Sequence, residues 1–306
     1  MSSGKTERAP LVVGIGELTW DLLPGGKQLG GAPSNFAYIS SLFGNRGIIV
    51  SAVGDDELGR EAIAYCDQLG LDTNYIQVDD DHPSSTVQVS LDEHGQPSFE
   101  IAKQIAWDFL TWNKDLEQLA RQVDVICFGS LAQRNQVSRD TTERFLRASR
   151  EGCLRIFDTN LRQAFFSPTV LKTGFALATV AKLNNNELPV VLQTLGLPAT
   201  DDPVTDCRLL LEQFGLELVC LTRGAHGSWL VTRDGASEHP GFRVGVIDTV
   251  GSGDAFAAAM AHQLRKGASL DVINEFANRV ASWVASRPGA TPVPSEHDLL
   301  HFAASF

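Results

Sequence analysis

Residues 248–254 (DTVGSGD) combine the features of an anion-binding turn with a carboxylate that could act as a base. An apolar stretch precedes the segment, and glycines flank Ser252, so successive backbone N–H groups can converge on a ligand. The helix expected next adds the partial positive charge of its N-terminus. Asp254 then stands where it can take a proton from a hydroxyl while neighbouring N–H groups stabilise negative charge. Taken alone, the segment predicts either this chemistry or a helix capped by Asp254.

A second pair of polar residues lies near the N-terminus. Asp21 follows the first predicted strand, and Asn35 belongs to residues 30–35 (GGAPSN), which open a predicted helix. A carboxylate accepts hydrogen bonds, and an amide both accepts and donates them, so this pair could hold the hydroxyls of a polyol. The alternative is a turn aspartate and an asparagine at a helix start.

Four further polar clusters follow predicted strands or the last long helix. Arg162 offers a planar fork of donors that suits phosphate oxygens. Asn184 and Glu187 could hold a hydrated Mg2+ through water, or cap the helix that follows. Thr222 and Gly224 could let hydroxyl and backbone groups approach a polyphosphate. The clusters are 158–162 (DTNLR), 184–187 (NNNE), 222–224 (TRG) and 287–290 (RPGA).

The composition indicates a soluble globular protein of 306 residues with 43% apolar and 20% charged side chains. The formal net charge of −12 argues against nonspecific binding to nucleic acid or to an anionic membrane. No apolar run is long enough to span a bilayer, and the polar residues 1–10 do not resemble a signal peptide. The cysteines, none in a CxxC pair, predict a reduced, cytoplasmic protein; they are Cys66, Cys127, Cys153, Cys207 and Cys220.

The elements that must position these clusters alternate between strand and helix. Such alternation predicts an α/β fold with a mostly parallel sheet and helices on both faces, and ligands bind at the carboxyl ends of such strands. Strands are predicted at 11–16, 47–53, 123–128, 154–158, 178–183, 218–222 and 227–231. Helices are predicted at 32–43, 57–69, 138–150, 187–195, 203–214, 254–264 and 270–286.

One region does not follow this alternation of strands and helices. Residues 86–91 alternate apolar and polar side chains, residues 92–97 read as a turn, and residues 98–101 read as a return strand. Such a hairpin, with one face open to water, is typical of a lid over a site. We therefore expect one domain over residues 11–306, with a discontinuous β lid from about 18–31 and 84–107 and a tail at 1–10.

Two nucleotide-binding motifs are excluded by their context. Residues 4–6 (GKT) imitate the end of a P-loop but lack the earlier glycine and the preceding strand. Gly14 and Gly16 resemble the start of a dinucleotide fingerprint, yet Thr19 stands where its third glycine belongs. A phosphate site must therefore be built differently.

Taken in their order along the chain, the six clusters resemble the phosphofructokinase B (PfkB), or ribokinase-like, family of carbohydrate kinases from about residue 11 to residue 294. One family signature is matched by Gly30 and Gly31 with Asn35, and the other by residues 248–254, where Ser252 replaces the common alanine. The resemblance implies a ribokinase-like three-layer sandwich with a small β-sheet lid, and an ATP-dependent sugar kinase.

The resemblance also implies roles for individual residues. Asp254 would be the general base, and the N–H groups of Gly251, Ser252 and Gly253 the anion hole, with Arg162 contacting the transferring phosphate. Asn184 and Glu187 match the motif linked to Mg2+. The nucleotide site would include Thr222, Gly224, Asn278, Gly289 and Ala290, and a monovalent cation such as K+ would bind Asp248 and the carbonyls of Val250 and Gly289.

The acceptor is expected to be a sugar, most closely D-fructose. Ala32 with Pro33, and residues 158–162, are similar to segments of bacterial fructokinases, although Thr159 departs from the proline found there. Such a kinase converts fructose to fructose 6-phosphate, and its substrate-binding residues here would include Asp21, Gly30, Gly31 and Asn35.

In the lid, Trp107 could cover a sugar face and Gln88 or Lys103 could reach hydroxyls, unless all three are ordinary packing residues. Other readings are a ribokinase or another carbohydrate or nucleoside kinase, and a non-catalytic sugar or nucleotide sensor. We expect a homodimer through the lid, because its strand edges need cover, and no nucleic-acid or membrane partner.

Overall fold

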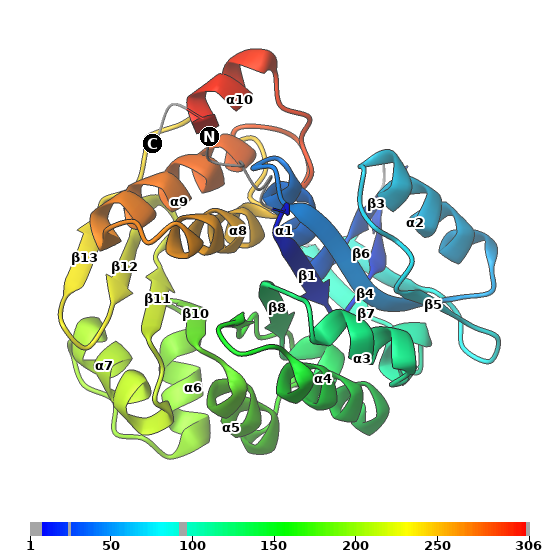
Figure 1. The fold of residues 1–306 in the computed structure, drawn as a ribbon, viewed down its shortest axis with the longest axis horizontal. Coiled ribbons are helices and arrows are strands. Elements are labelled where there is room, and N and C mark those ends of the chain that lie inside the picture. Colours follow the sequence, from blue (N-terminus) through cyan, green and yellow to red (C-terminus); the bar gives the residue numbers. More distant parts are fainter. Residues whose placement is uncertain (1–7, 24–25, 92–96, 304–306) are drawn as a thin grey trace, which may run out of the picture.

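The computed structural model describes residues 8–23, 26–91 and 97–303, and it shows an α/β fold around one large sheet (Figure 1). The sheet has nine strands in the order β13-β12-β11-β10-β9-β8-β1-β4-β5. Seven neighbouring strands, from β11 to β5, run parallel, and β12 and β13 are antiparallel. The strands are β1 Leu11–Ile15, β4 Arg46–Gly54, β5 Ile76–Asp79, β8 Val125–Gly129, β9 Leu154–Asp158, β10 Val180–Asn184, β11 Leu218–Thr222, β12 Ser228–Val231 and β13 Ala236–His239.

Helices cover both faces of this sheet, which makes three layers (Figure 1). One apolar layer packs α1, α8 and α9 on the sheet, and the other packs α3 to α7 on the opposite face. This is the predicted three-layer sandwich, and the predicted fold class is confirmed. The helices are α1 Ala32–Ser41, α2 Glu57–Gln68, α3 Lys114–Ala120, α4 Gln136–Ala148, α5 Pro168–Leu177, α6 Glu187–Leu195, α7 Pro203–Phe214, α8 Ser252–Arg265, α9 Leu270–Ala285 and α10 Glu296–Ala303.

A second, four-stranded sheet lies beside the carboxyl end of β1, in the order β3-β2-β6-β7. Its strands are β2 Thr19–Leu23, β3 Gly26–Gly30, β6 Ser85–Leu91 and β7 Pro97–Ile101. The predicted hairpin therefore forms as the antiparallel pair β6–β7, while β2 joins it by parallel pairing with β6. The predicted turn at 92–96 lies outside the described residues.

Close backbone approach brings the start of α1 to the end of β1. A Cβ atom at Gly14 would lie 2.1 Å from the carbonyl oxygen of Pro33, so only glycine permits this contact. A Cβ at Gly31 would lie 2.4 Å from the carbonyl oxygen of Glu17. These two glycines fix the helix start against the junction of the sheet and the lid.

Several elements were not predicted from the sequence: β5, β13, α3, α5 and α10. The two strands are four-residue edge strands (IQVD and ASEH), too short for a clear periodic pattern, which form because a neighbouring strand offers its hydrogen-bonding groups. The predicted helix at 254–264 begins earlier, at Ser252. Asp254 therefore lies in the first turn of α8 and is not its N-cap, which is Gly251 in a left-handed conformation.

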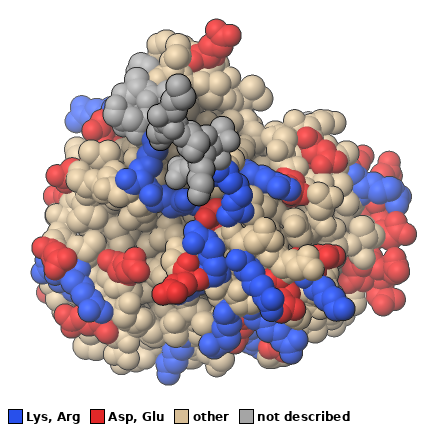
Figure 2. Space-filling model, viewed as in Figure 1, with Lys and Arg blue, Asp and Glu red and all other residues tan. Residues whose placement is uncertain are grey.

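The surface carries charges of both signs. Figure 2 shows basic and acidic side chains interspersed on one face of the molecule. The buried carboxylate of Asp124 forms ion pairs with Arg150 at 2.6 Å, with Arg8 at 3.3 Å and with Arg265 at 3.5 Å. Within the described residues, no helix is long and apolar enough to cross a membrane.

Candidate active site

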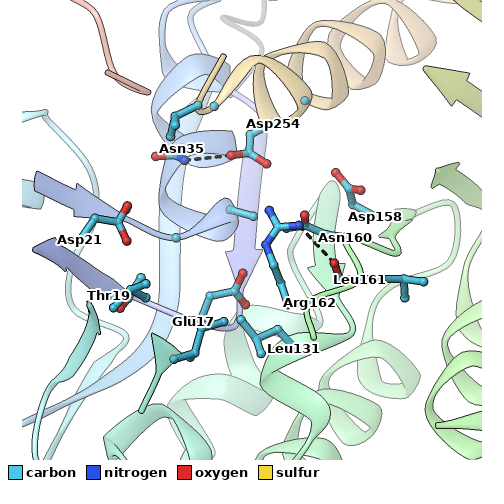
Figure 3. Close-up of a pocket in the computed structure, with 18 of the residues that line it drawn as sticks. Glu17, Thr19, Asp21, Asn35, Leu131, Asp158, Asn160, Leu161, Arg162 and Asp254 are labelled. Atoms are coloured by element: carbon cyan, nitrogen blue, oxygen red, sulfur yellow. Dashed lines mark hydrogen bonds between the residues drawn. The ribbon is translucent and has the colours of Figure 1, made fainter. Parts of the chain in front are cut away.

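A cavity of about 730 Å³ opens where the carboxyl ends of the central strands meet the lid sheet (Figure 3). The lid contributes Asp21 and Gly30, and the starts of α1 and α8 contribute Asn35 and Asp254. The ends of the central strands supply further polar groups. Predicted site residues that line this cavity are Asp21, Gly30, Gly31, Asn35, Trp107, Arg162, Asn184, Glu187, Thr222, Val250, Gly251, Gly253 and Asp254.

Asp254 and Asn35, far apart in the sequence, are joined by a hydrogen bond. The amide Nδ2 of Asn35 donates to Oδ2 of Asp254 at 2.8 Å (Figure 3). The pKa of Asp254 is raised to about 6, mainly by burial and in part by the charge of Asp158, while Asn35, Lys182 and Arg162 oppose the rise. Such a carboxylate is ionised at neutral pH and basic enough to accept a proton from a hydroxyl.

The turn before α8 differs in one respect from the predicted anion hole. The N–H of Ser252 donates to the carbonyl oxygen of Thr249 at 3.2 Å, so this donor is already used inside the loop. Gly253 and Asp254 follow in the first turn of α8, where N–H groups have no carbonyl partner within a helix. Gly251 has φ 77, and a Cβ there would lie 2.5 Å from the Cβ of Ala290.

A buried ion pair, which the sequence analysis did not identify, lies beneath this turn. Lys182 in β10 donates to Oδ2 of Asp158, at the end of the adjacent strand β9, at 2.7 Å. Burial opposes the charge on Lys182, but the attraction of Asp158 outweighs it and raises the lysine pKa. A Cβ at Gly253 would lie 3.3 Å from Nζ of Lys182, so the ammonium lies directly beside the turn.

Glu17 is a second residue that the sequence analysis missed. It lies between β1 and β2, is only 5% exposed and lines the cavity. Its pKa is raised to about 7, mainly by burial and in part by the charge of Asp254, while backbone N–H groups and Arg162 oppose the rise. A charged residue directly after an all-apolar strand was the available signal.

Arg162 and Asp21 both reach the cavity as predicted. Figure 3 shows the Arg162 guanidinium in the cavity between Glu17 and Asn160. Burial raises the pKa of Asp21, and the charge of Arg162 opposes that rise. A Cβ at Gly30 would lie 2.9 Å from Oδ2 of Asp21, so glycine leaves room for this carboxylate.

Asn184 and Glu187 form a hydrogen-bonded loop at the cavity wall. Glu187 accepts from the N–H of Asn184 and of Leu161, each at 2.8 Å, and from Oγ1 of Thr159 at 3.1 Å. Oδ1 of Asn184 accepts from the N–H groups of Asn186 and Glu187. The N-cap of α6 is Asn186, whose side chain makes no capping hydrogen bond, although Asn184 two residues earlier accepts from the first helical N–H. A water-mediated role of Glu187 toward Mg2+ stays a prediction. Among the described residues no group of three or more His, Cys, Asp or Glu could hold a metal.

Of the predicted nucleotide-site residues, only Thr222 lies on the cavity wall with Asn184 and Glu187. Asn278 is 6% exposed, and its amide donates to Oγ of Ser228 at 2.7 Å and to the carbonyl of Asn274 at 2.8 Å. Asn278 thus belongs to a buried hydrogen-bond network and does not line the cavity, and its predicted place near the nucleotide stays a prediction. Gly224 begins a short 3-10 turn after β11, also outside the cavity lining.

Asp248 brings together the residues predicted for a monovalent cation. Its Oδ1 accepts from the N–H of Val250 at 3.0 Å, and its Oδ2 accepts from the N–H of Gly289 at 3.2 Å. The three residues are thus neighbours, although both carboxylate oxygens already accept hydrogen bonds. Cation binding at this point stays a prediction.

The three residues predicted to contact the sugar from the lid differ in their placement. Trp107 lines the cavity and is 1% exposed, and its Nε1 finds no hydrogen-bond partner among the described residues. The Arg134 guanidinium lies over its ring, 4.3 Å from the ring centre. The ammonium of Lys103 lies over the ring of Phe165, 5.6 Å from its centre. Gln88 belongs to β6, but its side chain lies outside the described part of the chain.

The model of the pfkB family carbohydrate kinases matches residues 24–297. The chain belongs to this family. A fructokinase of Klebsiella pneumoniae is 33% identical over 259 residues, which cover 80% of this chain and 81% of that protein. A putative sugar kinase of Pyrococcus horikoshii is 27% identical over 311 residues, 95% of either chain. The crystal structure of the P. horikoshii sugar kinase in complex with ATP has a TM-score of 0.81 and 26% identity, covering 96% of this chain and 98% of that chain.

This pfkB family kinase is therefore a phosphotransferase that acts on a carbohydrate. The predicted family and enzyme class are confirmed. The P. horikoshii relative, which is 26% identical over nearly the whole chain, binds ATP in its crystal structure.

Proposed function

We propose that this kinase transfers the γ-phosphoryl group of ATP to D-fructose and forms fructose 6-phosphate. The observation that carries the proposal is the Asp254 carboxylate, held by Asn35 at 2.8 Å in the cavity, at the N-terminus of α8. A base there has the two neighbours that phosphoryl transfer needs: polar side chains for a sugar on the lid side, and helix N–H donors for a phosphate.

In the proposed reaction a sugar hydroxyl donates its hydrogen bond to Asp254. The carboxylate takes the proton as the hydroxyl oxygen bonds to phosphorus and the bond to the ADP oxygen breaks. The first-turn N–H of Gly253 and the positive charges of Lys182 and Arg162 stabilise the negative charge on the transferring group. Mg2+, held by the nucleotide phosphates and through water by Glu187, would neutralise phosphate charge.

Fructose as the acceptor is supported by two observations. Ala32 and Pro33 at the start of α1 resemble the corresponding segment of bacterial fructokinases, and the 33% identical relative from K. pneumoniae is named a fructokinase. Ribose, another carbohydrate or a nucleoside is the alternative acceptor.

The test is the release of ADP when the purified protein is mixed with ATP, Mg2+ and a panel of sugars. We expect D-fructose to give the highest kcat/KM and fructose 6-phosphate as the product. A higher kcat/KM for ribose or a nucleoside would identify that compound, and not fructose, as the acceptor. Binding of a sugar with no ADP release from any member of the panel would support the sensor alternative.

We also propose a homodimer formed through the lid sheet. In that sheet β3 and β7 are edge strands, whose unpaired backbone groups favour pairing with another chain. A mass of one chain in sedimentation equilibrium would contradict the dimer.

A further inference from the structure

Glu17 is a cavity residue to which the phosphoryl-transfer scheme assigns no role. It lies where β1 passes into β2, at the junction of the central sheet and the lid. Figure 3 shows its carboxylate pointing into the cavity, with Thr19 and Asp21 on one side and Arg162 on the other. The close approach of Gly31 to the Glu17 carbonyl fixes the backbone at this point.

The carboxylate of Glu17 is buried but incompletely satisfied. The side chain is 5% exposed, and Oε2 has no hydrogen-bond partner within the described protein. Nor does Glu17 form an ion pair with any described Lys, Arg or His within 4 Å. A buried polar atom left in this way costs free energy, which a hydroxyl donor from a bound molecule would recover.

The charges around this atom favour one kind of ligand. Three carboxylates, those of Glu17, Asp21 and Asp254, face the part of the cavity between the lid and α8. Among the described residues that line the cavity, the cationic side chains are Lys182 and Arg162, and Lys182 is already paired with Asp158. Hydroxyl groups can donate to these carboxylates, whereas a ligand carboxylate would meet like charge.

We infer that Glu17 binds a hydroxyl group of the acceptor and selects a neutral polyhydroxylated sugar over a sugar acid. The inference rests on the proposed function, since it requires the acceptor to occupy this cavity. Glu17 is thereby a specificity-determining residue that contacts substrate, distinct from the base Asp254 and from the phosphate-side residue Arg162.

The test compares two ligands that differ at one carbon. D-Fructose and 2-keto-D-gluconate share their remaining hydroxyls, but C1 is a hydroxymethyl group in the first and a carboxylate in the second. Calorimetric titration at pH 8, above the Glu17 pKa of about 7, gives the affinity of each for the full-length protein with a non-hydrolysable ATP analogue. We expect wild type to prefer fructose, and E17Q, which keeps shape but removes the charge, to lower this preference roughly tenfold or more.

Two variants serve as controls. D206N removes a buried carboxylate outside the cavity, which accepts from the N–H and Oγ1 of Thr200, and should leave the preference unchanged. E17D keeps a negative charge but shortens the side chain, so it should weaken fructose binding and still disfavour the acid. Thermal unfolding establishes that each variant folds. If E17Q does not fold, the fructose affinities of E17D and wild type are compared instead, and a weaker affinity of E17D supports the role of Glu17.

The inference is overturned if wild type binds 2-keto-D-gluconate as tightly as fructose, if E17Q leaves the preference unchanged, or if no neutral sugar of the panel binds. Because binding is measured without phosphoryl transfer, a failure of the proposed kinase activity can be distinguished from a failure of the role assigned to Glu17. A wild-type protein that binds fructose selectively, loses this selectivity in E17Q and releases no ADP would refute the kinase activity while upholding the role of Glu17.

Discussion

Lys182 and Asp158 form an ion pair of 2.7 Å between adjacent strands, directly beneath the turn that opens α8. Both side chains are nearly excluded from water, so neither charge could persist there alone. The pair places a fixed positive charge next to Gly253, where the proposed reaction develops negative charge. The ammonium is held by the protein before any ligand binds, which is the condition for electrostatic stabilisation without reorganisation.

Replacement of Lys182 by methionine should destabilise the fold and abolish turnover. The K182M variant leaves the Asp158 carboxylate buried without a partner, at an expected cost of about 3–5 kcal/mol in the free energy of unfolding. The double variant K182M/D158L removes both charges and should recover most of this loss without recovering activity. Urea unfolding and kcat separate the two effects.

A surface pair provides the matched control. Arg60 and Asp55 lie 2.9 Å apart with both side chains more than half exposed, so R60M should change the free energy of unfolding by less than about 1 kcal/mol. Recovery of substantial kcat in K182M/D158L would contradict a catalytic contribution from the lysine charge.

The Asp254→Ala variant should retain the fold and lose measurable turnover. General-base assistance typically contributes about 10²–10⁴-fold, and the carboxylate also orders the acceptor hydroxyl. Circular dichroism and thermal unfolding check the fold, and ADP release measures turnover. Substantial kinase activity in this variant would exclude Asp254 as the base.

The central elements could be predicted because their signals are local. Residues 154–158, 187–195, 203–214 and 218–222 have the same bounds in the structure as in the sequence prediction. The two strands are largely buried and mostly apolar, and each of the two helices ends at a glycine in a left-handed conformation. The edge strands β5 and β13 carry no such pattern, since they are stabilised by pairing with a neighbour that the sequence does not reveal.

The same distinction applies to the site. Asp254, Asn35 and Arg162 belong to local motifs, so the sequence identified them and the cavity contains them. The pairing of Lys182 with Asp158 depends on the register between β10 and β9, in which those two residues are partners, and no local pattern encodes it. A lysine between apolar residues of the strand at 180–184 was nevertheless a signal that a buried counter-charge must exist.

The rate should fall at acid pH as Asp254 becomes protonated. Its pKa of about 6 predicts that kcat/KM decreases tenfold for each pH unit below about 6, because only the ionised carboxylate accepts the proton. The hydrogen bond from Asn35 lowers this pKa, so N35L should shift the midpoint to higher pH. Profiles in the E17Q background remove the contribution of Glu17, which titrates near pH 7. A midpoint that does not move in N35L would argue against Asp254 as the titrating group.

The same pKa predicts how the stability of the free protein changes with pH. Because the Asp254 pKa is raised in the folded state, folding binds a proton between about pH 4 and pH 6, and stability falls as pH rises through that window. D254N removes this penalty and should be more stable than wild type at pH 8, by roughly 1 kcal/mol or more, with the difference vanishing near pH 4. Denaturant titrations at the two pH values measure the difference in the free energy of unfolding, with D206N as the control variant. A stability of D254N at pH 8 that equals or falls below that of wild type would contradict the prediction.

The two glycines of the turn should respond differently to alanine. Gly251 has φ 77, and an added Cβ would approach the Cα of Ala290 to 2.7 Å, so G251A should lose about 2 kcal/mol or more of stability. Gly253 lies within α8 at an ordinary helical conformation, where an added Cβ meets only the Lys182 side chain, at 3.3 Å. G253A should therefore keep the fold but lower kcat more than tenfold, because the methyl group occupies the approach of the phosphoryl group to the helix N-terminus. Thermal unfolding and kcat of both variants give the comparison, and a fully active G253A would show that the phosphoryl group does not approach at this point.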